Sequence, residues 1–121
     1  MTKTQTLQSF FSSFGLKAFQ EDSVPSGEDY PYLTYTVATD SFGADVPLSA
    51  SLWYRDTSWK SANNKVEEIS RSIGSGAILP CDGGAIWIKK GSPFAQSMGD
   101  PSDDLIKRKY INLTAEYLTA D

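Results

Sequence analysis

The chain has 121 residues, 40% of them hydrophobic and 21% charged, which is typical of one globular domain with a single core. Its formal net charge of −4 argues against a protein that reads nucleic-acid sequence, since such proteins display clustered basic residues. The absence of histidine and the single cysteine, Cys81, exclude histidine-dependent triads, histidine-ligated metals and an internal disulfide. We therefore expect one domain over residues 1–121 that needs no covalent staple.

The sequence contains no basic, apolar leader and no apolar run near the roughly 18 residues that a membrane-spanning helix requires. We therefore expect synthesis in the cytoplasm and no contact with a membrane. It also shows no internal repeat and no low-complexity segment, so nothing divides it into smaller units.

The N-terminal part begins with a helix pattern over residues 2–14. Thr2 and Gln5 form a capping-box pair, and a hydrophobic stripe at positions i, i+3, i+4 and i+7 follows them. Gly15 ends this predicted helix, and residues 16–20 are predicted to form a short strand. Residues 21–31 are polar and proline-containing, which predicts a loop.

Two alternating segments follow, at residues 32–39 and 48–54. Leu33 and Tyr35 alternate with threonines in the first segment, and Leu52 and Tyr54 flank Trp53 in the second. This period-2 pattern is typical of half-buried strands, and we expect the two to pair as an antiparallel hairpin.

The longest helix is predicted between Trp59 and Ile73. Its apolar residues recur every three or four positions, which places them in one buried stripe. The side chains of residues 56–58 are suited to cap its first turn, and Gly74 is suited to end it. The stripe comprises Trp59, Ala62, Val66, Ile69 and Ile73.

The C-terminal part is predicted to contain a short hairpin, a long loop and a final strand. Residues 77–81 and 85–89 flank an Asp-Gly-Gly turn, and residues 106–118 alternate clearly. We expect residues 91–103 between them to form a long functional loop. The sequence thus predicts an α+β domain: a largely antiparallel sheet of about five strands with two helices packed on one face.

Several residues are candidates for contacts between subunits, because apolar and charged side chains occur where the pattern predicts exposure. Trp53 and Trp87 fall on the polar face of their strands, and Phe42, Phe94 and Met98 lie in predicted loops. Each loop phenylalanine has an alternative interpretation, in which it packs on its own core. Acidic and basic residues near the last strand complete the set: Asp100, Asp103, Lys107, Arg108 and Lys109.

These charged residues have simpler interpretations as well. The aspartates lack the ordered spacing of a calcium loop and suit a solvated turn, while the basic run suits a solvated strand end. We identify no catalytic set, cofactor site or metal site. From these patterns alone we expect an α+β domain that forms oligomers, and they indicate no particular function.

The sequence resembles the tail-terminator, or tail-completion, proteins of long-tailed bacteriophages and prophages, over nearly its whole length. The resemblance rests on structural segments, none of which is a catalytic signature. These segments are Pro31–Tyr35, Ser51–Arg55 leading into the helix at Trp59, Gly91–Gln96, Gly99–Asp103 and Glu116–Leu118.

This resemblance implies a virion protein of the tail or neck, assembled in the host bacterial cytoplasm, with an α+β fold and no enzymatic activity. Such proteins form a ring, commonly a hexamer, that caps the head-proximal end of the tail tube, stops tube polymerisation and allows head–tail joining. The implied partners are other copies of the chain, the tail tube protein and the head–tail connector or head-closure protein. DNA would pass through the ring without sequence-specific binding.

Three other functions stay open at this point. A head-closure or neck ring protein of the connector has the same location and differs in which partner it binds first. A small monomeric binding protein would stay monomeric at high concentration. A carboxylate-dependent enzyme would need two acidic residues converging in one pocket.

Overall fold

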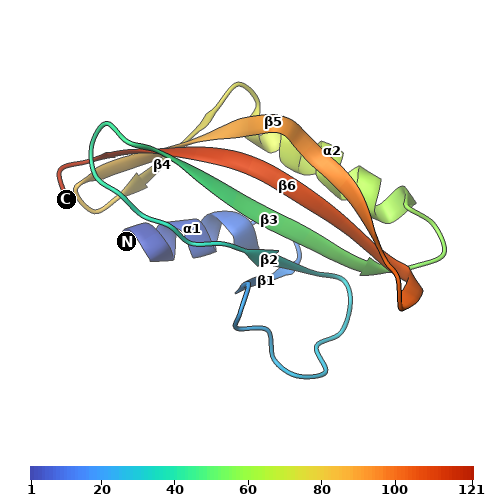
Figure 1. The fold of residues 1–121 in the computed structure, drawn as a ribbon. Coiled ribbons are helices and arrows are strands. Elements are labelled where there is room, and N and C mark those ends of the chain that lie inside the picture. Colours follow the sequence, from blue (N-terminus) through green and yellow to red (C-terminus); the bar gives the residue numbers. More distant parts are fainter.

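The computed structural model describes all residues, 1–121, as one sheet and two helices (Figure 1). The six strands lie in the order β1-β2-β3-β6-β5-β4. In chain order the elements are α1 (Lys3–Ser12), β1 (Lys17–Gln20), β2 (Tyr32–Tyr35), β3 (Asp45–Arg55), α2 (Lys60–Ile73), β4 (Ala77–Cys81), β5 (Gly84–Asp100) and β6 (Asp103–Thr119).

The expected sheet of about five largely antiparallel strands is wrong, because the sheet is mixed and has six strands. β1 runs parallel to β2, with Ala18 opposite Leu33, whereas the other neighbouring strands are antiparallel. A parallel pair requires a connection that returns the chain to the end where the first strand began. Residues 21–31 provide that connection.

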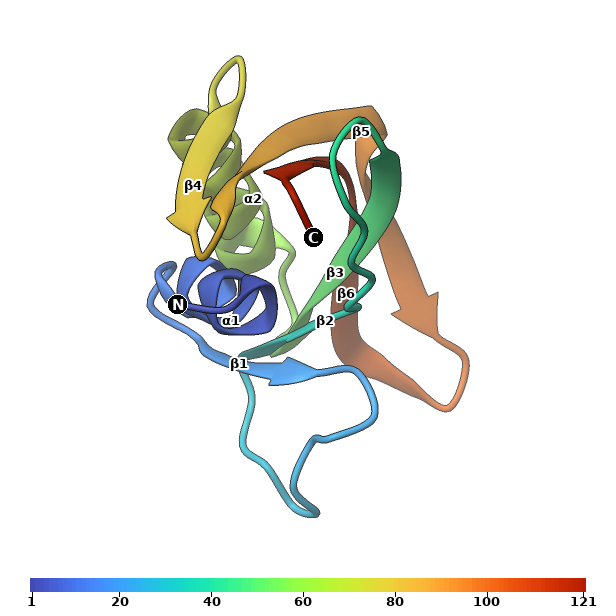
Figure 2. The same ribbon diagram turned by 90° about the vertical axis from the view of Figure 1, so that its left-hand side faces the viewer.

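The expected two-layer arrangement, with two helices packed on one face of the sheet, is also wrong, because the sheet curls around the helices and encloses them. Figure 2 shows the strands bending around α1 and α2. α1 contacts β1 and β4, which are the two edge strands, while α2 contacts β3, β5 and β6. A flat sheet would hold its two edges apart. The accumulated twist of the long strands brings both edges to α1 and encloses one core.

The long loop predicted at residues 91–103 is wrong as well. β5 and β6 form one continuous hairpin whose tip is residues 101–102. A β-bulge after Lys90 accommodates the glycine and proline that suggested a loop. Gly91 lies so close to β6 that a Cβ atom there would be 2.9 Å from the Cβ of Asn112. These residues therefore mark a close approach of two strands.

The two helices lie where the sequence predicts them. Thr2 and Gln5 form the capping box of α1, and Gly74 ends α2 with a positive φ of 58°. The N-cap residue of α2 is Trp59, which makes no side-chain hydrogen bond, and the predicted Ser58 accepts a hydrogen bond from the N–H of Lys60, the first residue of the helix, at 3.1 Å. The buried residues of α2 are the predicted Ala62, Val66, Ile69 and Ile73.

The two short hairpins are also confirmed. β2 pairs antiparallel with β3, and β4 pairs antiparallel with β5 at one edge of the sheet. β2 is shorter than expected, since it ends at Tyr35. Beyond it, the Thr36 N–H donates one more backbone hydrogen bond to β3, to the Ser49 carbonyl at 2.9 Å. The Tyr35 ring stacks on Phe11 of α1, with centroids 4.5 Å apart. This contact joins β2, the strand next to the sheet edge, to the first helix.

The alternation of side chains divides the sheet into two faces. The inward face packs with both helices into one core, which includes Leu52 of β3, Ile88 of β5 and Ile111 of β6. The residues between them along each strand face outward. The outer face of the sheet is therefore available for contacts with other molecules.

Candidate subunit interface

A row of outward-facing side chains crosses the sheet near the β5–β6 hairpin. The strand register places Lys17 opposite Tyr32, Tyr32 opposite Trp53, Trp53 opposite Arg108, and Arg108 opposite Met98. We call these five residues the aromatic–arginine row. Both helices pack against the inward-facing residues, so the row lies on the other side of the sheet from them.

Trp53 is fixed in the row by its neighbours on β2. Its indole Nε1–H donates to Thr34 Oγ1 at 2.8 Å, and its ring is stacked with Tyr32 at 6.3 Å between centroids. Tyr30 lies next to Tyr32, with 5.3 Å between centroids. Burial, followed by the neighbouring phenol of Tyr30, raises the pKa of Tyr32. The aromatic part of the row is therefore uncharged and held in one geometry.

Arg108 stacks against two aromatic rings. Its guanidinium carbon lies 4.6 Å from the ring centroid of Trp53 and 5.4 Å from that of Tyr110. Its Nε–H donates to Ser51 Oγ at 3.1 Å. None of the six ion pairs of the chain includes Arg108. The row thus contains a preorganised cation whose charge is not neutralised within the chain.

The expected basic patch of Lys107, Arg108 and Lys109 is divided between the two faces of β6. The ammonium groups of Lys107 and Lys109 lie 5.8 and 5.2 Å from the ring centroid of Trp59, at the start of α2. Lys109 also donates to Ser97 Oγ at 2.6 Å. Successive residues of a strand point to opposite faces, so this separation follows from the strand itself.

Asp100 and Asp103 lie at the hairpin tip and bond within the chain. Asp100 Oδ1 accepts hydrogen bonds from the hydroxyl of Ser102 at 2.7 Å and from its N–H at 2.8 Å, which lower the pKa of Asp100. Asp103 pairs with Arg55 at 3.1 Å and accepts from the Leu105 N–H at 3.0 Å. Both carboxylates therefore shape the turn between β5 and β6.

Trp87 also faces outward, but at the other end of the sheet. Its partner on β6 is Glu116, whereas the partner of Trp53 is Arg108, so the two positions are separated by roughly 26 Å along β6 at about 3.3 Å per residue. The ammonium group of Lys89 lies 4.6 Å from the Trp87 ring centroid. The two tryptophans therefore belong to separate places on the outer face.

The three remaining candidates differ in exposure. Phe42 is 74% exposed in the connection between β2 and β3, and Met98 is 38% exposed beside Arg108. Phe94 is partly buried, packs against the core and carries the Lys90 ammonium group 5.6 Å from its ring centroid. Of these three, only Met98 belongs to the aromatic–arginine row.

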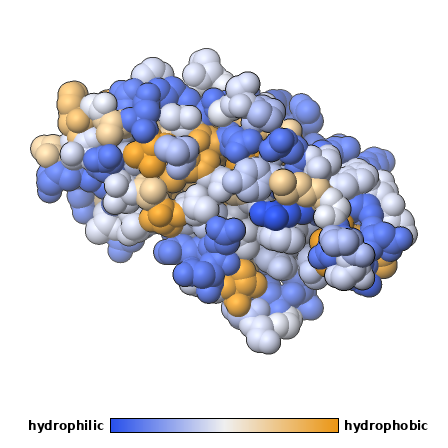
Figure 3. Space-filling model, viewed as in Figure 1, coloured by the Kyte–Doolittle hydropathy of each residue, from blue (hydrophilic) through white to orange (hydrophobic).

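Tyr32 and Tyr110 belong to this site but were not identified from the sequence. The signal was present, because both occupy the same face of the alternation as Trp53 and Arg108. Figure 3 shows the face of the molecule seen in Figure 1 as mostly hydrophilic or neutral, with hydrophobic residues in a few separate areas.

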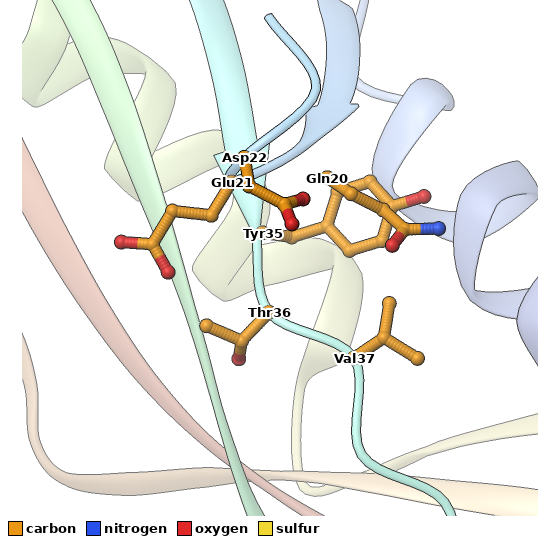
Figure 4. Close-up of a pocket in the computed structure, with 6 residues that line it drawn as sticks. All are labelled: Gln20, Glu21, Asp22, Tyr35, Thr36 and Val37. Atoms are coloured by element: carbon orange, nitrogen blue, oxygen red, sulfur yellow. The ribbon is translucent and has the colours of Figure 1, made fainter.

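A second feature is a shallow hollow at the end of β1 and β2. Figure 4 shows the carboxylate side chains of Glu21 and Asp22 at this hollow, with Tyr35 and Thr36 beside them. Neither carboxylate forms an ion pair within the chain. The hollow is therefore an acidic place at the edge of the sheet.

The chain has no group of three or more acidic, cysteine or histidine residues that could hold a metal ion. No helix has the length and hydrophobicity to cross a membrane. No known family model matches the sequence, and no curated protein matches it either.

Proposed function

We propose that the protein is a structural component of a bacteriophage or prophage virion, a tail terminator that acts as a ring. In this role it caps the head-proximal end of the tail tube, stops tube polymerisation and allows head–tail joining. The observation that carries the proposal is the aromatic–arginine row on a sheet face that neither helix covers. The sequence resemblance supports the same function.

The residue types in the row support a protein contact. Tryptophan, tyrosine, arginine and methionine are enriched at interfaces, and the first three dominate binding energy there. A buried aromatic anchor holds such a complex, while charges at its rim set orientation and association rate. In the proposed interface Trp53, Arg108 and Met98 contact a neighbour, and Phe42 is a further exposed contact.

The proposed ring also has to pass DNA. A chain with a formal net charge of −4 attracts phosphate weakly, because phosphate is bound by cations. We therefore propose that DNA slides through the ring without specific binding. The proposed partners are other copies of the chain, the tail tube protein and the connector or head-closure protein.

Native mass spectrometry with and without the tube protein tests this function. Electron microscopy of the mixture of this protein with purified tail tube protein gives the tube lengths. We expect six-membered rings, and tubes that stop growing when the protein is added. Monomers in both conditions, with unchanged tube lengths, would reject the proposal.

The same mixture separates the tail terminator from a head-closure ring of the connector. A tail terminator binds purified tubes before it binds the connector. A head-closure protein shows the reverse order, binding connector first. Competition between the two partners, measured by co-sedimentation, therefore assigns the protein to one end of the joint.

A further inference from the structure

We propose that the aromatic–arginine row receives the β1–β2 loop, residues 21–31, of a neighbouring copy of this chain. The contact pairs Arg108 with the carboxylates of Glu21 and Asp22. This inference rests on the proposed ring, and it names the segment that each subunit presents to the next.

Arg108 is built to accept a carboxylate. Its only hydrogen bond within the chain uses Nε, so both Nη amino groups lack an acceptor. The rings of Trp53 and Tyr110 hold the guanidinium in place. A planar guanidinium binds a carboxylate through two parallel hydrogen bonds, and fixing it in advance reduces the entropy lost on binding.

The β1–β2 loop is the segment of this chain that fits such a site. Its carboxylates Glu21, Asp22 and Asp29 make no ion pair within the chain, whereas Glu28 is already paired with Lys17 at 3.0 Å. The loop projects from the body of the protein in both ribbon views (Figures 1 and 2). Glu21 and Asp22 lie at the base of the loop, where the Glu21 N–H donates to the Tyr35 carbonyl at 2.9 Å, so two exposed, unpaired carboxylates are held at the edge of the sheet.

The other acidic segments fit less well. The carboxylates of Asp100 and Asp103 at the hairpin tip bond to Ser102 and Arg55, and those of Asp45 and Glu116 are paired with Lys89. A single strand of nucleic acid would also use stacked aromatic rings, but its phosphates need several cations along a track. The row offers one cation without a partner, since Lys17 is paired with Glu28.

A charge exchange between the two surfaces tests the contact. Arg108→Glu and the double variant Glu21→Arg, Asp22→Arg are each expected to weaken self-association about tenfold or more, because each places like charges together. Combining all three changes restores opposite charges and is expected to restore association. Sedimentation velocity on the full chain, with and without the tube protein, measures the effect.

Two matched controls use the same substitutions elsewhere. Glu67→Arg and Arg71→Glu lie on the exposed side of α2 and are expected to leave association unchanged. Arg108→Lys keeps the charge without the planar fork, so it is expected to weaken association less than Arg108→Glu. Thermal melting shows whether each variant is folded. If Arg108→Glu fails to fold, Arg108→Lys tests the contact in its place.

The outcomes are distinct. Restored association in the combined variant supports the contact, whereas folded single variants that associate like the wild type reject it. Binding of single-stranded DNA that depends on Arg108, with unchanged self-association, also rejects it. Wild-type protein that stays monomeric in both conditions rejects it too. If Arg108→Glu still stops tube growth, the proposed contact is rejected and the proposed function stands. If the combined variant restores association but neither it nor the wild type stops tube growth, the contact stands and the proposed function is rejected.

Discussion

Each end of the outer sheet face carries a tryptophan ring with a cation against it, but the two cations have different neighbours. At one end Arg108 lies 4.6 Å from the Trp53 ring centroid, and at the other Lys89 lies 4.6 Å from that of Trp87. Lys89 also pairs with Asp45 and Glu116, each at 3.3 Å, so its charge is neutralised within the chain. Arg108 has no such partner. The Trp87 end is thus complete by itself, and the Trp53 end is suited to a second molecule.

The largest expected effect comes from the core that both ends share. Ile69→Asp places an unpaired charge where Ile69 is only 2% exposed, which costs several kcal/mol against a total stability of about 5 to 15 kcal/mol. We expect the variant to lose the cooperative thermal transition seen for the wild type by circular dichroism. A melting temperature within a few degrees of the wild type would contradict the packing of α2.

The next effect separates the two ends directly. Trp53→Ala is expected to weaken self-association by more than about 2 kcal/mol, the level typical of a central aromatic anchor. Trp87→Ala is expected to leave association unchanged, since its ring already packs within the chain beside Gly76 and Lys89. Sedimentation velocity and thermal melting of both variants provide the comparison. Equal loss of association in the two variants would remove the distinction between the ends.

A smaller effect concerns Tyr117, which neighbours Glu116 at the Trp87 end. Burial raises the pKa of Tyr117 to about 12, and its hydroxyl donates to the Ala38 carbonyl at 2.5 Å. A tyrosine in the unfolded chain loses its proton near pH 10, so the unfolded state binds fewer protons between pH 10 and pH 12. The contribution of Tyr117 to stability is therefore present below pH 10 and is lost as the pH rises toward 12.

Tyr117→Phe tests this contribution. We expect the variant to lose less stability than the wild type between pH 10 and pH 12, because it has no proton to release there. Urea unfolding at a series of pH values measures the slope. Parallel slopes for the two proteins would show that Tyr117 does not contribute to the alkaline transition.

The smallest effect is expected for Lys89→Met. The substitution removes both ion pairs of the Trp87 end, but partly exposed pairs contribute little and are screened by salt. We expect a small fall in melting temperature at low salt that disappears at high salt, and no change in association. A clear loss of association would show that the Trp87 end also contacts a neighbour.

Much of the local structure could be predicted from the sequence. The capping box at Thr2, the stripe of α2 and the hairpin turn before Gly84 all depend on residues a few positions apart. The division of Lys107 and Arg108 between two faces was predictable too, because the alternation that identified β6 extends through them. The expectation of one basic patch treats Lys107, Arg108 and Lys109 as neighbours in the sequence, without assigning each side chain to a face of the strand.

The bulge at Gly91 was not predictable in the same way. A glycine followed closely by proline is typical of a loop, and only the pairing of β5 with β6 shows that the strand continues past it. The partners within the site also depend on strand pairing. The sequence therefore identified Trp53 as an outward-facing aromatic residue but did not identify its partner. Its contact with Arg108 joins two strands that are far apart in the sequence.

The sequence by itself therefore determined which segments become helices and strands and which side chains share a face, because periodicity is a local property. Only the tertiary structure decided the parallel pairing of β1 with β2, the curl that brings both sheet edges to α1, and the partner of each charge. Arg55 meets Asp103, for example, across 48 positions of the chain. Such pairs depend on strand order and register, which arise from packing the whole core and leave no local pattern.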